Sequence, residues 1–405
     1  MKGDRSMKTR TWLALGLASL FLSACQANEG AEGEVEGDVT STTIEGTEVI
    51  HIGFSGPLSG SAAYYGQNAL SGLTMAVDEI NEAGGIDVAG ETHSLNVVTL
   101  DDKYLPNETG ANTRRLVQEY DTPIIYVPHS GGIFATQVFN EQEEFLLAAF
   151  SSEPDITQQD NGLTYRLPPT YDHYVDPFAS YQMERFGPKI AMLPTNTQYG
   201  LDWADELRPH WEAMGGEIVY DGTVDFSKDT DFFTIVTNAL RDDPDVLFVG
   251  GSSEPTGQVM KQARELGFEG GFLIMEQAKL DEIANVFDGD LTELEGSVGV
   301  APLSYNRHEG NAAFIDKYEE RYDKVPGSEA GYHYFSIYIL TEAMKAAGTA
   351  TDAYEIRAHL NEGLKEVPPE YQLYDVPEID EGGGMVTSFT MAVIEDGEVV
   401  LTVQD

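Results

Sequence analysis

The stretch that decides the fold is residues 49–86, which read VIHIGFSGPLSGSAAYYGQNALSGLTMAVDEINEAGGI. It begins with a short apolar strand over 49–54 and continues through a turn rich in Ser, Gly and Pro over 55–61. A long helix with periodic apolar residues follows, and Gly84 and Gly85 end it. Small residues that open a helix present N–H groups and hydroxyls at its positive end. The stretch therefore predicts either a site for an anionic group or an ordinary βα turn.

Short apolar runs alternate with amphipathic stretches along the rest of the chain, which predicts α/β units around parallel sheets. The pair Pro168-Pro169 interrupts this series, and because consecutive prolines break both helix and ladder we expect a crossing between domains there. A second crossing is expected at 298–303, and Asp396-Gly397 predicts a terminal hairpin. In open α/β sheets, ligands bind at the carboxyl ends of the strands. The expected strands are 95–100, 124–127, 145–150, 190–193, 217–220, 246–249 and 272–275.

Length and charge narrow the class of protein. The 405 residues are enough for two domains of ordinary size. There are 23 basic and 69 acidic residues, so the formal net charge is −46. Such a surface repels nucleic acids and anionic membranes, which excludes a DNA or RNA partner. We expect an acidic surface suited to a salty medium, because salt screens the repulsion between like charges.

The N-terminal residues have the features of a targeting segment. Basic residues precede an apolar run over 12–22 that is too short to span a bilayer, so we predict a signal peptide over 1–24. Small residues directly before Cys25, the one cysteine, resemble a bacterial lipobox, which implies that Cys25 is lipidated and becomes the mature N-terminus. A plain signal peptide and a start at Met7 remain alternatives. Residues 25–48 are predicted to be a flexible acidic tether, the alternative being a partly ordered edge segment.

Enzymatic motifs are absent from the sequence. It contains no G-x-S-x-G elbow, no P-loop and no G-x-G-x-x-G, and its eight histidines form no pair at metal-ligand spacing on a helix. His129 lies beside Ser130, a possible base next to a possible nucleophile, but neighbours in an extended segment point to opposite faces. We therefore predict no catalytic residue, metal or cofactor, and a secreted hydrolase is a remote alternative.

Short hydroxyl side chains recur at the predicted strand ends. Hydroxyls beside helix N–H groups suit a ligand carboxylate, although each serine can equally cap a helix. Glu276 follows a buried strand and can bind an ammonium group, unless it is a surface ion-pair residue. Tyr65 and Tyr199 are candidates for the pocket wall. Anion donors at one end and a carboxylate at the other predict a zwitterionic ligand. The serines are Ser130, Ser151, Ser152, Ser252 and Ser253.

Five motifs occur in order along the chain: GPLSGSAAYYG (56–66), DEINEAGGI (78–86), SSEPDIT (151–157), NTQYG (196–200) and GGSSEPTGQVMKQARELG (250–267). In these motifs, from position 49 to about 347, the chain resembles type I periplasmic binding proteins of branched-chain amino-acid ABC transporters, such as Leu/Ile/Val-binding proteins. The resemblance implies a monomer with two Rossmann-like lobes that are joined by three hinge crossings and close on a ligand. We expect lobes of 49–168 plus 303–363 and of 169–302 plus 364–405.

The resemblance also implies roles for individual residues. Ser130 and Ser152 fall where hydroxyls hold the ligand's α-carboxylate and α-ammonium, and Glu276 falls on the carboxylate that pairs with the ammonium. Further pocket positions are Tyr65, Phe150, Ser151 and Tyr199. Ser252-Ser253 stand where Leu/Ile/Val binders carry tyrosines, which predicts a larger or more polar pocket.

The function implied is capture of a small molecule outside the cytoplasmic membrane. The ligand is expected to be an amino acid or analogue, with an amide, urea or a small acid as alternatives. ABC permease subunits are the expected partners, and the membrane is reached only through the lipid anchor. A ligand-sensing subunit for a signalling receptor is the alternative of another class.

Overall fold

The computed structural model describes residues 38–39 and 43–402. The predicted signal peptide, Cys25 and most of the predicted tether lie outside the described residues. Residues 38–39 form β1 (Asp38–Val39), which pairs with β4 through Asp38↔Thr99 and Val39↔Val98. This part of the predicted tether is therefore an edge strand. None of the described helices is long and apolar enough to cross a membrane.

The first sheet has the order β1-β4-β2-β5-β6-β7, with β3 also paired to β4. Neighbours from β4 to β7 run parallel, whereas β1 and β3 are antiparallel to β4. The central strands are buried on both faces and read as continuous apolar runs, as buried parallel strands do. Their bounds are β2 (Glu48–Gly56), β3 (Ile86–Val88), β4 (Glu91–Asp101), β5 (Ile124–Val127), β6 (Leu146–Ala149) and β7 (Thr164–Arg166).

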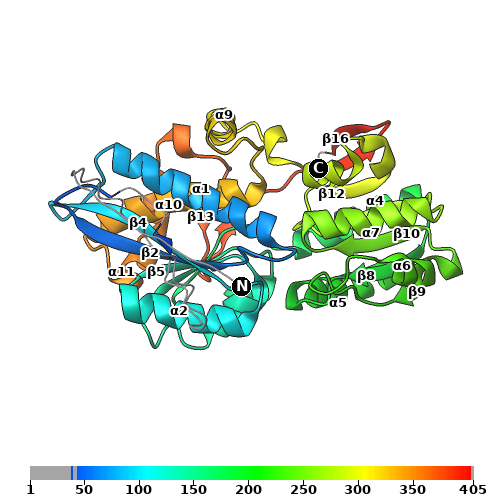
Figure 1. The fold of residues 1–405 in the computed structure, drawn as a ribbon, viewed down its shortest axis with the longest axis horizontal. Coiled ribbons are helices and arrows are strands. Elements are labelled where there is room, and N and C mark those ends of the chain that lie inside the picture. The colour runs from blue at the N-terminus through cyan, green and yellow to red at the C-terminus, as the bar shows by residue number, and fades with distance from the viewer. Residues whose placement is uncertain (1–37, 40–42, 403–405) are drawn as a thin grey trace, which may run out of the picture. The chain divides into compact units, whose positions relative to one another are not determined.

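Helices cover this sheet on both faces, with α1 on one side and α2 on the other (Figure 1). Helix α1 packs closely against α10: a Cβ on Gly72 would lie 2.0 Å from the carbonyl oxygen of Ala330, so only glycine allows this approach. The aromatic residues Tyr332, Tyr334, Phe335 and Tyr338 of α10 are buried in the core. The helices are α1 (Ala63–Glu82), α2 (Pro106–Tyr120), α3 (Ser130–Gln137), α9 (Asn311–Tyr322), α10 (Ser328–Ala347), α11 (Ala353–Ala358) and α12 (Leu360–Glu366).

The second sheet has the order β16-β15-β12-β11-β10-β8-β9. Its strands run parallel from β12 to β9, while β15 is antiparallel to β12 and β16. Asp396 and Gly397 have φ of 52° and 73°, the left-handed turn that joins the predicted hairpin. The elements are β8 (Lys189–Pro194), β9 (Glu217–Asp221), β10 (Val246–Gly250), β11 (Gly271–Ile274), β12 (Ser297–Val300), β15 (Met391–Glu395), β16 (Glu398–Thr402), α4 (Asp172–Arg185), α5 (Gln198–Ala213), α6 (Phe233–Ala239), α7 (Ser253–Glu265) and α8 (Leu280–Ala284).

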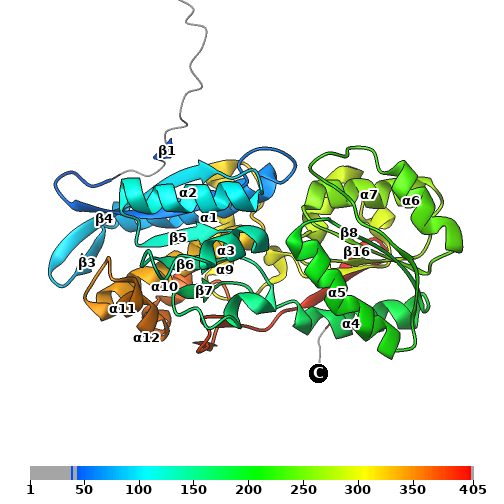
Figure 2. The same ribbon diagram turned by 90° about the horizontal axis from the view of Figure 1, so that it is seen from below.

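The chain passes three times between the first lobe, built on the first sheet, and the second lobe, built on the second sheet. The crossings lie at 167–171, 301–310 and 387–390, and Figure 2 shows the red C-terminal segment entering the second lobe. The predicted α/β fold with two mostly parallel sheets is confirmed.

One segment lies in a different lobe from the one expected. Residues 364–386, expected in the second lobe, include Leu373, Ile379 and Met385, which belong to the core of the first. They contain β13 (Glu378–Ile379) and β14 (Met385–Val386). The physical reason is aromatic packing on α10: the ring of Tyr374 stacks on that of Tyr332 with centroids 3.8 Å apart.

Candidate functional site

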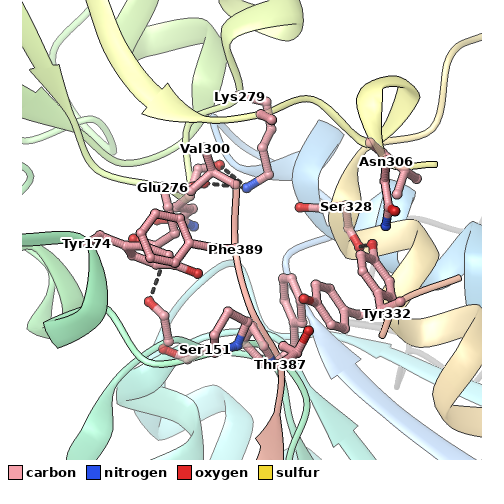
Figure 3. Close-up of a pocket in the computed structure, with 18 of the residues that line it drawn as sticks. Ser151, Tyr174, Glu276, Lys279, Val300, Asn306, Ser328, Tyr332, Thr387 and Phe389 are labelled. Atoms are coloured by element: carbon pink, nitrogen blue, oxygen red, sulfur yellow. Dashed lines mark hydrogen bonds between the residues drawn. The ribbon is translucent and has the colours of Figure 1, made fainter. Parts of the chain in front are cut away.

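A cavity of about 180 Å³ lies where the carboxyl ends of strands from both lobes meet, and we call it the inner cavity. All three crossings line it, through Pro168-Pro169, residues 300–303 and residues 387–390. The wall of the inner cavity therefore contains the three segments that would bend if the lobes moved relative to each other. Figure 3 shows Glu276 on the same side as Tyr174 and Phe389, with Tyr332 and Ser328 facing them across the hollow.

Seven of the eight predicted ligand-binding residues line the inner cavity. They lie after strand ends or at the starts of helices, because the polypeptide leaves each parallel strand at this edge. Ser252 instead lines an adjoining outer hollow of about 640 Å³, which Ser130 and Tyr199 also line. The seven are Tyr65, Ser130, Phe150, Ser151, Ser152, Tyr199 and Glu276.

The carboxylate of Glu276 accepts hydrogen bonds from neutral donors on both lobes. Its Oε1 accepts from the hydroxyl of Ser152 in the first lobe. Its Oε2 accepts from the hydroxyl of Tyr199 and, at 2.9 Å, from Nε1 of Trp203, both on α5. Burial and the nearby Glu276 carboxylate raise the pKa of Tyr199 well above its usual value, so this hydroxyl remains a donor. Within residues 43–402, no lysine, arginine or histidine forms an ion pair with Glu276.

The serine hydroxyls are not used as helix caps. Ser130 is the first residue of α3, whose N-cap is His129, and its Oγ lies 2.8 Å from that of Ser151. Ser252 is the N-cap of α7 but its side chain makes no capping hydrogen bond. The hydroxyls of Ser130 and Ser152 are buried at the cavity wall. The Ser152 hydroxyl donates to Glu276, and the role of both serines in ligand binding stays a prediction.

Both ring nitrogens of His129 form hydrogen bonds within the first lobe. Its Nδ1 accepts from the backbone N–H of Gly132 at 3.1 Å, so its Nε2 carries the proton and lies 3.0 Å from Oδ2 of Asp102. The imidazole is stacked under Tyr104, with ring centroids 4.5 Å apart. Since neither ring nitrogen is directed at Ser130, the described geometry contains no Ser130–His129 relay.

Several residues that line the inner cavity were not predicted from the sequence. Lys279 is buried and its Nζ donates to the carbonyl oxygens of Glu276 at 2.5 Å and Gln277 at 3.0 Å. Tyr332 lies on α10 among aromatic residues at helical spacing, a pattern typical of buried core rather than of a binding site. Tyr174 lies in the first turn of α4. The others lie in crossings or irregular segments, where no periodic pattern marks a pocket residue. They include Tyr104, Gln277, Asn306, Tyr374 and Phe389.

Comparison with known proteins places this arrangement in a family. The family model described as periplasmic binding protein matches residues 49–398. A leucine-, isoleucine-, valine-, threonine- and alanine-binding protein of Pseudomonas aeruginosa is 25% identical over 325 residues, which cover 79% of this chain and 84% of that protein. The Leu/Ile/Val-binding protein of Escherichia coli K12 is 24% identical over 272 residues, 66% of this chain and 72% of that one.

Solved structures agree on the fold. The branched-chain amino acid transporter substrate binding protein LivJ of Streptococcus pneumoniae, in complex with isoleucine, has a TM-score of 0.72 and 24% identity, with 88% of this chain and 100% of that chain covered. A solute binding protein of an ABC transporter from R. palustris, in complex with benzoate, has a TM-score of 0.72 and 17% identity. The match covers 87% of this chain and 95% of that chain. Because the family model spans both lobes and all three crossings, the chain belongs to the periplasmic binding protein family.

Proposed function

We propose that this protein captures an amino acid in the inner cavity and delivers it to an ABC permease. The observation that carries the proposal is the Glu276 carboxylate, which accepts three hydrogen bonds from neutral donors and has no cationic partner among the described residues. A negative charge left without a counter-ion in a low-dielectric cavity favours a ligand that brings a positive charge. An α-ammonium group supplies it.

The carboxylate of the zwitterion fits the first-lobe side of the inner cavity. Ser130 begins α3 and its hydroxyl lies 2.8 Å from that of Ser151, so a carboxylate there is favoured by neutral donors and by the positive helix end. A small carboxylic acid without an amine, such as the benzoate bound by the R. palustris protein, would bring a second negative charge towards Glu276. Glu276 therefore favours an amino acid over a simple acid.

The pocket walls favour a largely apolar side chain. Tyr65 and Phe150 have ring centroids 6.1 Å apart, and Phe150 and Tyr332 are 5.8 Å apart, so they form a continuous aromatic surface. The names of the Pseudomonas aeruginosa and Escherichia coli relatives support an aliphatic ligand. Ser252 borders the outer hollow with a short hydroxyl, which leaves room there for a longer or more polar side chain than leucine.

Ligand capture works through the three crossings. The hydrogen bond between Ser152 and Glu276 joins the two lobes, and an ammonium group bound there would add contacts to both. A ligand shifts a conformational equilibrium only by binding one state more tightly, so these cross-lobe contacts favour the closed form. The closed form is what a permease would recognise. The lipobox-like Leu22-Ser23-Ala24-Cys25 supports anchoring of the protein by Cys25 outside the cytoplasmic membrane.

A thermal-shift screen tests the proposal. Because a ligand that binds only the folded state raises the melting temperature, amino acids, short amides, urea and benzoate can be ranked in one experiment at high salt. We expect one or more apolar L-amino acids to raise it by several degrees and benzoate to leave it unchanged. A shift with benzoate or urea and none with any amino acid would contradict the proposal.

A further inference from the structure

Two carboxylates and an imidazole meet at the end of the first sheet that faces away from the inner cavity. Glu48 is the first residue of β2 and pairs directly with His93 on the parallel strand β4. Glu91 precedes His93 by two residues on β4, so both side chains lie on one face of the sheet. The two-residue turn at Ala89 and Gly90, with φ of 54° and 90°, fixes where β4 begins.

The donor atoms of these three residues form a compact set. One ligand atom from each of Glu48, Glu91 and His93 lies within 4.8 Å of the other two. They line a hollow of about 510 Å³ at the strand ends. The side chain of Glu48 is 73% exposed, so it can turn toward the imidazole at little cost.

The imidazole of His93 is buried and lacks one hydrogen bond. Its side chain is only 9% exposed, yet its Nδ1 has no hydrogen-bond partner among the described residues and lies 3.7 Å from Oε2 of Glu48. Buried polar atoms are almost always satisfied, so an imidazole nitrogen left unpaired beside two carboxylates points to an occupant that the described residues do not supply.

We propose that Glu48, Glu91 and His93 bind one divalent transition-metal ion of the Zn²⁺ class. Imidazole nitrogen with carboxylate oxygen suits Zn²⁺, Co²⁺ or Ni²⁺, whereas Ca²⁺ and Mg²⁺ take oxygen ligands. Bonds of about 2.0–2.2 Å place neighbouring ligand atoms roughly 3.3 Å apart, which small rotations of the exposed glutamates reach. With three protein ligands, water completes the coordination of a tetrahedral ion.

The site is separate from the inner cavity. β2 has nine residues, and at about 3.3 Å per residue Glu48 lies roughly 26 Å from its other end, which leads toward the ligand-binding edge. An ion there would link the start of β2 to the β3–β4 hairpin, so it stabilises the first lobe without touching the solute. Histidine spacing along helices does not detect this arrangement, because its ligands come from two strands.

Calorimetric titration of the chelator-treated protein with ZnCl₂ tests the inference. The buffer contains 0.5 M NaCl and excess MgCl₂, which suppress non-specific binding to a chain of net charge −46. We expect one equivalent of Zn²⁺, a higher melting temperature, and a visible absorption spectrum when Co²⁺ is used instead. Glu91→Gln and His93→Asn should each weaken binding at least tenfold.

The matched control is His173→Asn, which removes an exposed histidine whose Nδ1 lies 3.4 Å from the carboxylate of Asp172. It should leave the Zn²⁺ affinity unchanged. Glu91→Gln changes an exposed side chain and should keep the fold. Its Zn²⁺ affinity therefore tests the inference even if His93→Asn fails to fold. Unchanged Zn²⁺ affinity in Glu91→Gln, or no Zn²⁺ binding by wild type in this Mg²⁺-containing buffer, would overturn the inference. Solute affinity should be the same with and without Zn²⁺.

Discussion

Replacing Glu276 by glutamine tests the role of its charge most selectively. The substitution keeps the shape of the side chain and one acceptor oxygen, but it removes the negative charge. It also turns an NH₂ group toward either Ser152 or the pair Tyr199 and Trp203, all of which donate to Glu276 in the structure. The ligand's ammonium group would then face a neutral amide.

The expected loss of affinity follows from the geometry. Removing one partner of a buried, hydrogen-bonded charge pair costs about 2–5 kcal/mol. Glu276 is partly rather than fully buried, so the lower part of that range applies. About 2–3 kcal/mol corresponds to a roughly 30- to 150-fold higher Kd for the amino acid.

Isothermal titration calorimetry with the best amino acid from the thermal-shift screen measures this loss. The matched control is Glu79→Gln in the first lobe. The Glu79 carboxylate also accepts from aromatic side chains, the hydroxyls of Tyr334 at 2.6 Å and Tyr338 at 2.8 Å, but it lies outside the inner cavity. We expect Glu79→Gln to lower stability and keep the affinity. Equal affinities for wild type and Glu276→Gln, with both folded by circular dichroism, would refute the assignment.

Three further predictions concern the hinge, the packing and the titration of the fold. Ser152→Ala removes a cross-lobe hydrogen bond and should raise the Kd about 5- to 13-fold by calorimetry, since a hydrogen bond contributes about 1–1.5 kcal/mol; an unchanged Kd would exclude Ser152 from the site. Gly72→Ala should lower the melting temperature, because its Cβ would lie 2.0 Å from the backbone oxygen of Ala330. The control Gly110→Ala should not lower it, because that Cβ would meet no atom closer than 3.9 Å. Equal melting temperatures for the two variants would contradict the packing argument. Burial and the nearby Asp202 raise the pKa of Glu153 to about 8, so its contribution to stability is full below about pH 4.5 and is lost as the pH rises through 8. Glu153→Gln should therefore flatten the fall in melting temperature between pH 5 and 8, and a curve parallel to that of wild type would count against this.

Much of the fold could be predicted from the sequence because its local signals are strong. Central strands such as β5 and β10 are buried on both faces and read as apolar runs, and turns such as Asp396-Gly397 have a specific backbone requirement. The periplasmic binding protein resemblance is confirmed by the match over 49–398, and with it the prediction of a binding protein rather than an enzyme. The position of 364–386 was not predictable, because stacking of Tyr374 on Tyr332 depends on tertiary contacts.

The candidate site was predictable only in part. The ends of buried strands can be recognised in the sequence, so Ser130, Ser152 and Glu276 could be predicted as ligand-binding residues. All three line the inner cavity in the structure. Their roles in binding remain predictions. Lys279 and Phe389 could not be found, because the first follows a strand by several residues and the second lies in a crossing without periodicity. Residues that reach a site across a hinge carry no local signature.

The most direct test of the central claim is a pair of calorimetric titrations of wild-type protein, one with leucine and one with 4-methylpentanoate. The two molecules share the carboxylate and the aliphatic side chain, and only leucine carries the ammonium group that Glu276 is proposed to bind. We predict measurable 1:1 binding of leucine and at least 30-fold weaker binding of 4-methylpentanoate, as expected for the loss of about 2 kcal/mol. Equal or tighter binding of 4-methylpentanoate would contradict the account.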